Sequence, residues 1–289
     1  LQLVWLAPGL SASRQPAPRA VEFKEDFHAE HDPDLGWAHQ PGKQIVDFYG
    51  AGRTITINRQ GLRGQEDYTS QVPPNRFRVI CLGDSFTLGY GVDDAATYPA
   101  QLEVVNPAVQ AVNMGQGGYS IGQCYLWYQR DGGRLQANAV VAAFILDDIW
   151  RMAGGRMANG AAMPEFELMG SRLRVRGQPL PEKIATGQPL YSNGKLLDLF
   201  FEHSAIFRTA QVVVAPARAA RENVDQNVQL RVALVILDEL RREAVLKGAP
   251  LILVIMPEMT ELTDPARQPL YREVTRAIAT FARQANIPM

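Results

Sequence analysis

The sequence predicts an α/β protein in which helices flank a parallel β-sheet to form a three-layer α/β/α sandwich, and three observations support this prediction. Apolar runs typical of strands buried on both faces alternate with segments in which apolar residues recur at helical spacing. The chain has 289 residues, 46% of them hydrophobic, which is enough to bury a large core. Each apolar run ends in glycine or polar residues, as expected where a strand gives way to a loop.

Residues 1–75 precede this alternation. The first ten, LQLVWLAPGL, are apolar but supply only about half of the roughly 20 residues that a membrane span needs. They fit either the tail of a membrane anchor or signal segment or a short ordered apolar arm, and the Pro and Arg content of residues 11–20 is that of a linker. Residues 21–75 are polar and turn-rich, and we expect an N-terminal extension with a few short strands, one of them in RTITIN (53–58).

The first three strands of the sheet are expected in residues 76–149. The apolar runs are RFRVICLGD (76–84), AVQAVNMGQ (108–116) and AVVAAFILDD (139–148), with helical patterns between them at 97–105 and 120–135. A strand, a helix and a second strand in succession form a crossover connection, which favours parallel pairing.

Residues 150–225 interrupt the alternation. We interpret them as an insertion over the carboxyl end of the sheet, with a hairpin around Gly170-Ser171 and a helix over 195–214. A long helix capped by Gly248, a fourth strand over 249–257 and a helix over 264–286 follow, and a fifth strand should begin at 287. The predicted units are therefore an arm and linker (1–20), the extension (21–75) and an α/β domain (76–289).

Charge and cysteine content exclude several classes of protein. The 29 basic and 30 acidic side chains give a net charge of -1, which provides no basic field for nucleic acid. The two cysteines, Cys81 and Cys124, lie in a strand pattern and a helix pattern, so we expect small core residues and no disulfide framework.

Ser85 is the candidate catalytic residue, because it directly follows the first strand in the segment VICLGDSFTLGYG (79–91). Ligands bind at the carboxyl ends of the strands in an open parallel sheet, and Gly83 should let the chain turn sharply there. A nucleophilic serine also needs a base for its proton and donors for the oxyanion that it creates. The alternative is that Asp84 or Ser85 only caps the next helix.

The segment GDSFTLG resembles the first motif block of the SGNH/GDSL hydrolase superfamily, and two further segments resemble its later blocks. NMGQGGYS (113–120) matches the second block, with Asn113 leading and Gly118 in the position that supplies an oxyanion N–H, and FILDDIW (144–150) stands where the family has an Asn-Asp pair. The resemblance implies a flavodoxin-like sandwich, an acyl-enzyme on Ser85 and an oxyanion hole formed by Ser85, Gly118 and residue 147.

The third block departs from the family pattern, because Asp147 replaces the donor Asn. An ionised carboxylate only accepts hydrogen bonds, and the loss of one oxyanion donor costs about 2.7–4 kcal/mol of transition-state stabilisation. One alternative is that burial or the neighbouring Asp148 raises the pKa of Asp147, so that the protonated carboxyl donates a hydrogen bond. The other is that the Asp147 side chain points away from the oxyanion and the N–H groups of Ser85 and Gly118 are sufficient.

The family also carries its base in an Asp-x-x-His block after the last strand, and this block is not found in residues 1–289. We expect the base in residues beyond Met289, with His203 in the insertion as an alternative. We expect no metal and no cofactor, because His28 and His31 lack a third ligand and a short His pair in a polar loop is usually solvated.

The resemblance implies a serine esterase that hydrolyses ester-linked acyl groups, above all acetyl groups. It also implies a location in the cell envelope of a bacterium, because the segments upstream of the sheet look like the extensions of exported or membrane-anchored members. One alternative passes the acyl group to a sugar hydroxyl, as an O-acetyltransferase of an exported polysaccharide. Another is an inactive SGNH fold that binds a glycan or a partner. The expected partner is a small-molecule or glycan ester. Aromatic side chains also occur in residues 119–127, at Trp150 and in residues 200–207. They either line a pocket for the acyl group or the sugar or, as helical spacing favours, pack in the core.

Overall fold

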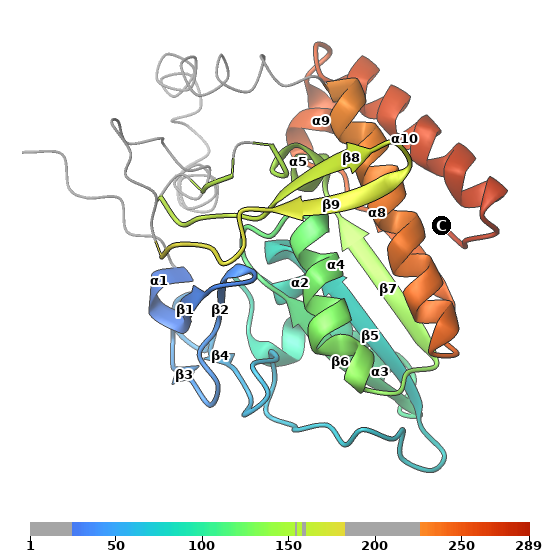
Figure 1. The fold of residues 1–289 in the computed structure, drawn as a ribbon. Helices are drawn as coiled ribbons and strands as arrows, with labels where there is room; N and C mark the ends of the chain where they lie inside the picture. Colours follow the sequence, from blue (N-terminus) through green and yellow to red (C-terminus); the bar gives the residue numbers. More distant parts are fainter. Residues whose placement is uncertain (1–24, 154, 158–159, 183–225) are drawn as a thin grey trace, which may run out of the picture.

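The computed structural model describes residues 25–153, 155–157, 160–182 and 226–289. Its centre is a four-stranded parallel sheet in the order β10-β7-β5-β6 (Figure 1). The strands are β5 (Phe77–Gly83), β6 (Val109–Gly115), β7 (Ala139–Phe144) and β10 (Leu251–Ile255). Counted along the chain, this order is 2-1-3-4, which is the flavodoxin-like arrangement, and the strand order reverses between β5 and β7. The predicted fold class is confirmed.

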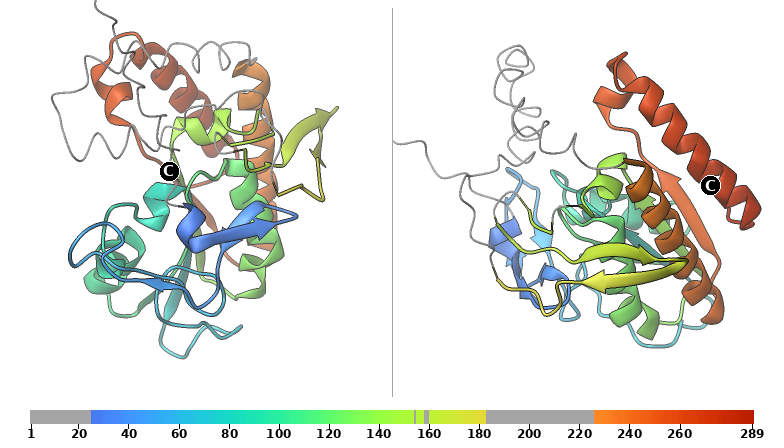
Figure 2. Two further views of the ribbon diagram at one scale, coloured as in Figure 1. Left: turned by 90° about the vertical axis from the view of Figure 1, so that its left-hand side faces the viewer. Right: turned by 45° about the horizontal axis from the view of Figure 1, so that its top comes forward.

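Helices cover the sheet. They are α2 (Ser85–Leu88), η1 (Asp94–Ala96), α3 (Tyr98–Val105), α4 (Ile121–Arg130), η2 (Gly132–Arg134), α5 (Leu146–Trp150), α8 (Gln226–Leu246), α9 (Met259–Thr263) and α10 (Gln268–Gln284). α4 and α8 lie side by side across the sheet, α3 packs along β6, and α10 lies at the β10 edge (Figures 1 and 2).

The central strands form the core because their side chains are apolar on both faces. In β5 every residue after Phe77 is buried, and Ile80 and Leu82 are completely enclosed. Cys81 in β5 and Cys124 in α4 are buried free thiols, as the sequence predicts. Tyr119 and Trp127 are also core residues, so the packing alternative holds for these two aromatics.

The extension packs closely on the sheet. It consists of α1 (Glu25–His28), the antiparallel pair β1 (Ala29–Asp32) and β2 (Gly36–His39), and the antiparallel pair β3 (Gln44–Ile45) and β4 (Ile55–Thr56). Leu35 and Trp37 join the main core, while Ile55 and Ile57 form a second cluster with Leu88 of α2. The extension therefore shares its apolar contacts with the helix that carries Ser85.

The second half of the chain follows its predicted elements where the structure describes them. β8 (Glu165–Met169) and β9 (Arg172–Arg176) form the hairpin, and Gly248 ends α8 with a left-handed φ of +84°. The N–H of Leu253 in β10 donates to Pro288 O at 2.9 Å, so the last residues lie along the edge of β10, where a fifth strand was expected. The helix predicted over 195–214 lies outside the described residues.

Within those same residues, no helix combines the length and the apolar character needed to cross a bilayer.

Candidate active site

Ser85 lies at the carboxyl end of β5 and is the first residue of α2. The preceding Asp84 is the helix N-cap, and its side chain accepts a hydrogen bond of 2.9 Å from the N–H of Phe86. Because Asp84 performs the capping role, the hydroxyl of the half-buried Ser85 does not need to.

Gly83 is required at the end of β5 for a reason other than the predicted one. Its φ is not positive, so it makes no left-handed turn. A Cβ at this position would instead lie 2.0 Å from Thr87 Oγ1 and 2.4 Å from Ala143 O. Glycine is needed because α2 and β7 approach the strand end too closely for any side chain.

Gly118 lies in the loop after β6, in a turn closed by the N–H of Tyr119, which donates to Gln116 O at 3.2 Å. Its φ of +76° is left-handed, as at the third residue of a type II turn, and this favours glycine. Trp37 of the extension anchors the loop by donating from Nε1 to Gly117 O at 3.0 Å. Among the described residues, the backbone N–H groups of Ser85 and Gly118 have no hydrogen-bond partner, as oxyanion donors require.

Arg151 joins the loops that follow β5, β6 and β7. Its Nη1 atom donates to Tyr119 O at 3.1 Å, lies 3.6 Å from Asp84 Oδ2 and pairs with Asp148 Oδ1. These three contacts belong to residues immediately adjacent in sequence to the predicted Gly118, Ser85 and Asp147. One guanidinium nitrogen therefore holds together the three strand ends that carry the predicted site.

Asp84 and Asp148 are both buried beside this guanidinium. Burial raises the pKa of both carboxyls, and the attraction of Arg151 opposes the rise. Burial disfavours the charge of Arg151 as well, but Asp148 and Asp84 outweigh it and raise the pKa of the guanidinium. The arrangement places two acids and one cation at the start of α2.

Asp147 is half-buried at the start of α5, and the fully buried acid of the pair is Asp148, which accepts from the N–H of Ile145 at 3.1 Å. Asp147 lies near Glu258 and Glu261, two acids that follow β10. Burial, then Asp147 and Glu261, raise the pKa of Glu258 to about 7. Acidic side chains therefore gather at the carboxyl ends of β7 and β10. That Asp147 donates a hydrogen bond to the oxyanion stays a prediction.

The expectation that His28 is solvated is wrong, because His28 and His39 form a buried pair under the sheet edge. Their Nδ1 atoms are 3.2 Å apart, and His39 Nε2 donates to Gly115 O at 2.9 Å. His39 Nδ1 must then accept, so His28 Nδ1 donates. Burial lowers the pKa of His28 to about 4 and that of His39 to about 3. Both imidazoles are neutral at pH 7.

None of the imidazoles in the described ranges contacts Ser85. The exposed His31 bonds to Gly36 O at 3.3 Å, and His203 lies outside those ranges. The same ranges contain no group of three or more His, Cys, Asp or Glu side chains that could hold a metal ion.

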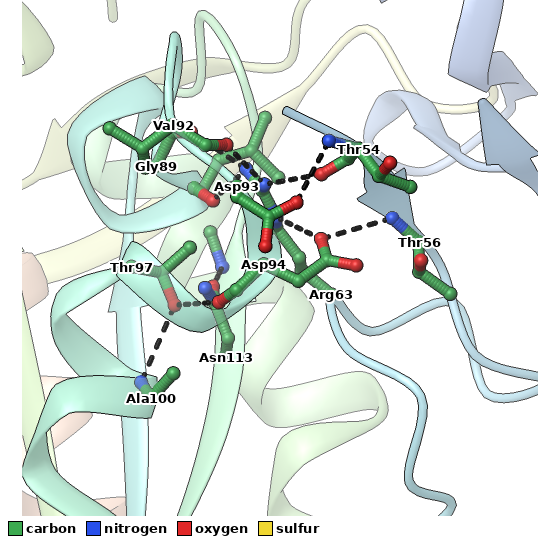
Figure 3. A network of polar contacts seen from close by, with 12 residues as sticks. Thr54, Thr56, Arg63, Gly89, Val92, Asp93, Asp94, Thr97, Ala100 and Asn113 are labelled. Atoms are coloured by element: carbon green, nitrogen blue, oxygen red, sulfur yellow. Dashed lines mark hydrogen bonds and ion pairs between the residues drawn. The ribbon is translucent and has the colours of Figure 1, made fainter. Parts of the chain in front are cut away.

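Arg63 of the extension holds the other end of α2 (Figure 3). Its Nη1 donates to Leu88 O at 2.6 Å and to Gly89 O at 2.7 Å, its Nη2 donates to Val92 O at 2.8 Å, and its Nε pairs with Asp94 at 3.0 Å. The side chain is only 1% exposed. These bonds satisfy carbonyl groups that a helix end leaves without partners.

Asn113 of β6, which leads the second motif block, secures the same helix. Its Nδ2 donates to Thr87 O at 2.9 Å, and its Oδ1 accepts from the N–H of Gly115 at 2.9 Å. Sequence analysis singled out Asn113 but missed Arg63 and Arg151. The local signals for them are the turn NRQGLRG, in which Arg63 follows a glycine turn, and the position of Arg151 one helical turn after Asp147-Asp148.

Comparison with known proteins gives limited similarities. No family model matches the chain, and no curated protein matches it. A solved structure described as a proposed lipolytic protein of the G-D-S-L family from Desulfitobacterium hafniense DCB-2 is 14% identical, with 74% of this chain and 75% of that chain covered and a TM-score of 0.40.

A member of the lipolytic protein G-D-S-L family from Veillonella parvula DSM 2008 is also 14% identical, with 73% of this chain and 75% of that chain covered and a TM-score of 0.37. At this level of similarity, the function has to be inferred from the residues of the chain itself.

Proposed function

We propose that the protein is a serine esterase of the SGNH/GDSL type that hydrolyses ester-linked acyl groups. The Ser85 Oγ attacks the carbonyl carbon while its proton passes to a general base, and the N–H groups of Ser85 and Gly118 stabilise the oxyanion. The bond to the leaving alcohol breaks, and the alcohol takes up the proton. Water then attacks the acyl-enzyme, releases the carboxylic acid and restores the Ser85 hydroxyl.

The observation that supports this proposal best is the convergence of three strand-end loops on Arg151 Nη1. It brings the peptide units next to Ser85 and Gly118 to one point at the carboxyl edge of the sheet, where open α/β folds bind ligands. The lack of a hydrogen-bond partner for either N–H among the described residues leaves both donors for a substrate oxygen.

A fluorophosphonate probe tests the proposal, because it phosphonylates activated serines. We expect the probe on Ser85, located by peptide mass spectrometry, and no labelling after Ser85→Ala. Ser70→Ala is the matched control, since Ser70 is an exposed serine far from the strand ends in sequence. Labelling of Ser70 and Ser85 at the same slow rate would contradict an activated nucleophile.

The source of the base is tested by the same labelling. We propose that the base is an imidazole, so removal of that imidazole should slow the labelling of Ser85 to the rate of Ser70. Loss of rapid labelling in His203→Ala would assign the base to His203, and unchanged labelling would exclude this residue.

A second candidate function, an inactive fold that binds a glycan or a partner, is favoured by Asp147 in the place of the donor Asn. Asp147→Asn distinguishes the two. If Asp147 has no role in an active enzyme, the added donor should raise kcat/KM by up to about 100-fold. A value well below wild type would show that the carboxyl itself is used, and no activity in either protein would favour the binding function. Product analysis with an acetyl donor and a glycan identifies water or sugar as the acceptor.

A further inference from the structure

A pocket of about 230 Å³ opens beside Ser85, between α2 and the start of α3. Its lining comes from α2, from the loop between α2 and η1, and from the start of α3. The lining residues are Ser85, Phe86, Gly89, Tyr90, Val92, Ala96, Thr97 and Tyr98. The pocket thus shares the candidate nucleophile with the site at the strand ends.

The lining carries no formal charge at neutral pH. Burial raises the pKa of Tyr98 well above its ordinary value, so its phenol stays neutral. The Tyr98 hydroxyl lies 3.3 Å from Thr87 Oγ1, and Thr97 Oγ1 donates to Asp94 O at 3.0 Å while accepting from Ala100 N–H at 3.4 Å. Because these polar groups are already used, the pocket offers mainly apolar surface, and a charged ligand group would be desolvated there without compensation.

The size of the pocket limits what it can hold. Pockets for drug-sized ligands measure roughly 300–1,000 Å³, and this one is smaller. A cavity of about 150 Å³ holds a benzene molecule, so this volume suits a group of up to about eight carbon atoms and is too small to enclose a long lipid chain or an oligosaccharide.

The pocket wall is held in place by the extension (Figure 3). Arg63 bonds to the carbonyls of Gly89 and Val92, which lie in the lining loop. The N–H of Thr54 donates to Asp93 at 2.9 Å and that of Thr56 to Asp94 at 3.1 Å. A wall fixed by these bonds does not have to be ordered when a ligand binds.

We propose that this pocket binds a short, uncharged acyl group whose carbonyl carbon lies at Ser85 Oγ. The inference rests on the proposed esterase function and adds a limit on the acyl chain. It also assigns the N-terminal extension a part in specificity, since the extension fixes the wall that sets this limit.

The first test measures kcat/KM for p-nitrophenyl acetate, butyrate and palmitate. The wild type should prefer acetate and butyrate to palmitate by about tenfold or more. Val92→Phe, which fills part of the pocket, should lower the butyrate value much more than the acetate value. Val104→Phe is the matched control on the exposed face of α3 and should leave the profile unchanged.

The second test needs no turnover and separates this inference from the proposed function. Methyl butyrate is titrated into Ser85→Ala, and the NMR signals of the Val92 methyl groups and the Tyr98 ring should shift and saturate. In Ser85→Ala combined with Val92→Phe, the Tyr98 ring signals should not shift. Binding without hydrolysis in the wild type would overturn the esterase and retain the pocket. The pocket assignment would be overturned if hydrolysis occurs and Val92→Phe leaves its chain-length profile unchanged. It would also be overturned if methyl butyrate shifts the NMR signals of residues outside the pocket instead. The absence of both binding and hydrolysis would overturn both.

Discussion

Two arginines, the buried Arg63 and the partly buried Arg151, hold the two ends of α2, and their surroundings differ in charge. Arg63 grips the end after Ser85 through carbonyl oxygens and one carboxylate, whereas Arg151 lies before it between two buried carboxylates. The contacts of Arg63 depend on the planar shape of the guanidinium, whose N–H groups point at fixed angles toward several oxygen atoms. Those of Arg151 depend on charge balance, because each buried carboxylate needs the cation.

The difference extends to the titrating groups around each arginine. On the Arg63 side, burial and the Arg63 charge lower the pKa of His28. On the Arg151 side, burial and neighbouring acids raise the pKa of Asp148 and Glu258. A base with a lowered pKa makes the fold lose stability as pH falls, and an acid with a raised pKa makes it lose stability as pH rises. The two ends of α2 should therefore be sensitive to opposite changes of pH.

Arg151→Met should have the largest effect on stability. Removing the cation leaves Asp84 and Asp148 buried without a countercharge, which costs about 3–5 kcal/mol of unfolding free energy. Urea denaturation at pH 7 measures the loss, which should shrink at pH 5, where the carboxyls take up protons more readily. Arg242→Met removes an exposed arginine from an ion pair and should cost below about 1 kcal/mol. A similarly small loss for Arg151→Met would mean that the two acids are already neutral in the folded protein.

Arg63→Lys tests whether charge or geometry matters at this end of α2, because lysine keeps the positive charge and lacks the planar guanidinium. One ammonium cannot bond to Leu88 O, Gly89 O and Val92 O together, so we expect a loss of about 1–3 kcal/mol that does not depend on pH between 6 and 8. The control is Arg53→Lys, since the exposed Arg53 makes a single bond of 3.3 Å to Gly91 O in the same loop. An unchanged unfolding free energy in Arg63→Lys would show that charge alone is sufficient at this end.

His28→Gln should reduce the sensitivity to acid. Since the pKa of His28 is about 4 when folded and about 6.5 when unfolded, the unfolded chain binds one more proton between these values, and stability falls as pH drops through this window. In the variant, unfolding should take up about one proton fewer between these pH values, so the unfolding free energy should fall less steeply as pH drops. At pH 5 the acid-induced loss of unfolding free energy should be smaller than in wild type by on the order of 2 kcal/mol. An identical slope in His28→Gln would contradict a buried neutral imidazole.

Glu258→Gln should act in the opposite direction and more weakly. The pKa of Glu258 is about 7 when folded and about 4.5 when unfolded, so its carboxyl lowers stability progressively as pH rises from 4.5 to 7. The variant should gain on the order of 1–2 kcal/mol relative to wild type between pH 5 and pH 8, because Glu258 is partly solvated. Glu239→Gln, on the exposed side of α8, provides the control. A gain that is the same at both pH values would show that the carboxyl does not titrate with folding.

The sequence alone predicted the elements whose signals are local. The apolar runs predicted β5, β6, β7 and β10 because strands buried on both faces must be apolar throughout. The position of Ser85 followed from the rule that parallel strands present their carboxyl ends to ligands. Gly118 and Asn113 were found only through the resemblance of NMGQGGYS to the second motif block of the SGNH/GDSL superfamily.

What only the tertiary structure decided is which polar side chains are buried. Arg63 and His28 lie in polar segments, and such residues are exposed in most proteins, so nothing local marks them as buried. Arg63 reaches carbonyl groups 25 to 29 positions further along the chain, so these contacts exist only where the fold brings the extension against α2. Their burial is stabilised by partners supplied from distant segments, because a buried charge or imidazole is tolerated only where the fold provides the matching oxygen or nitrogen.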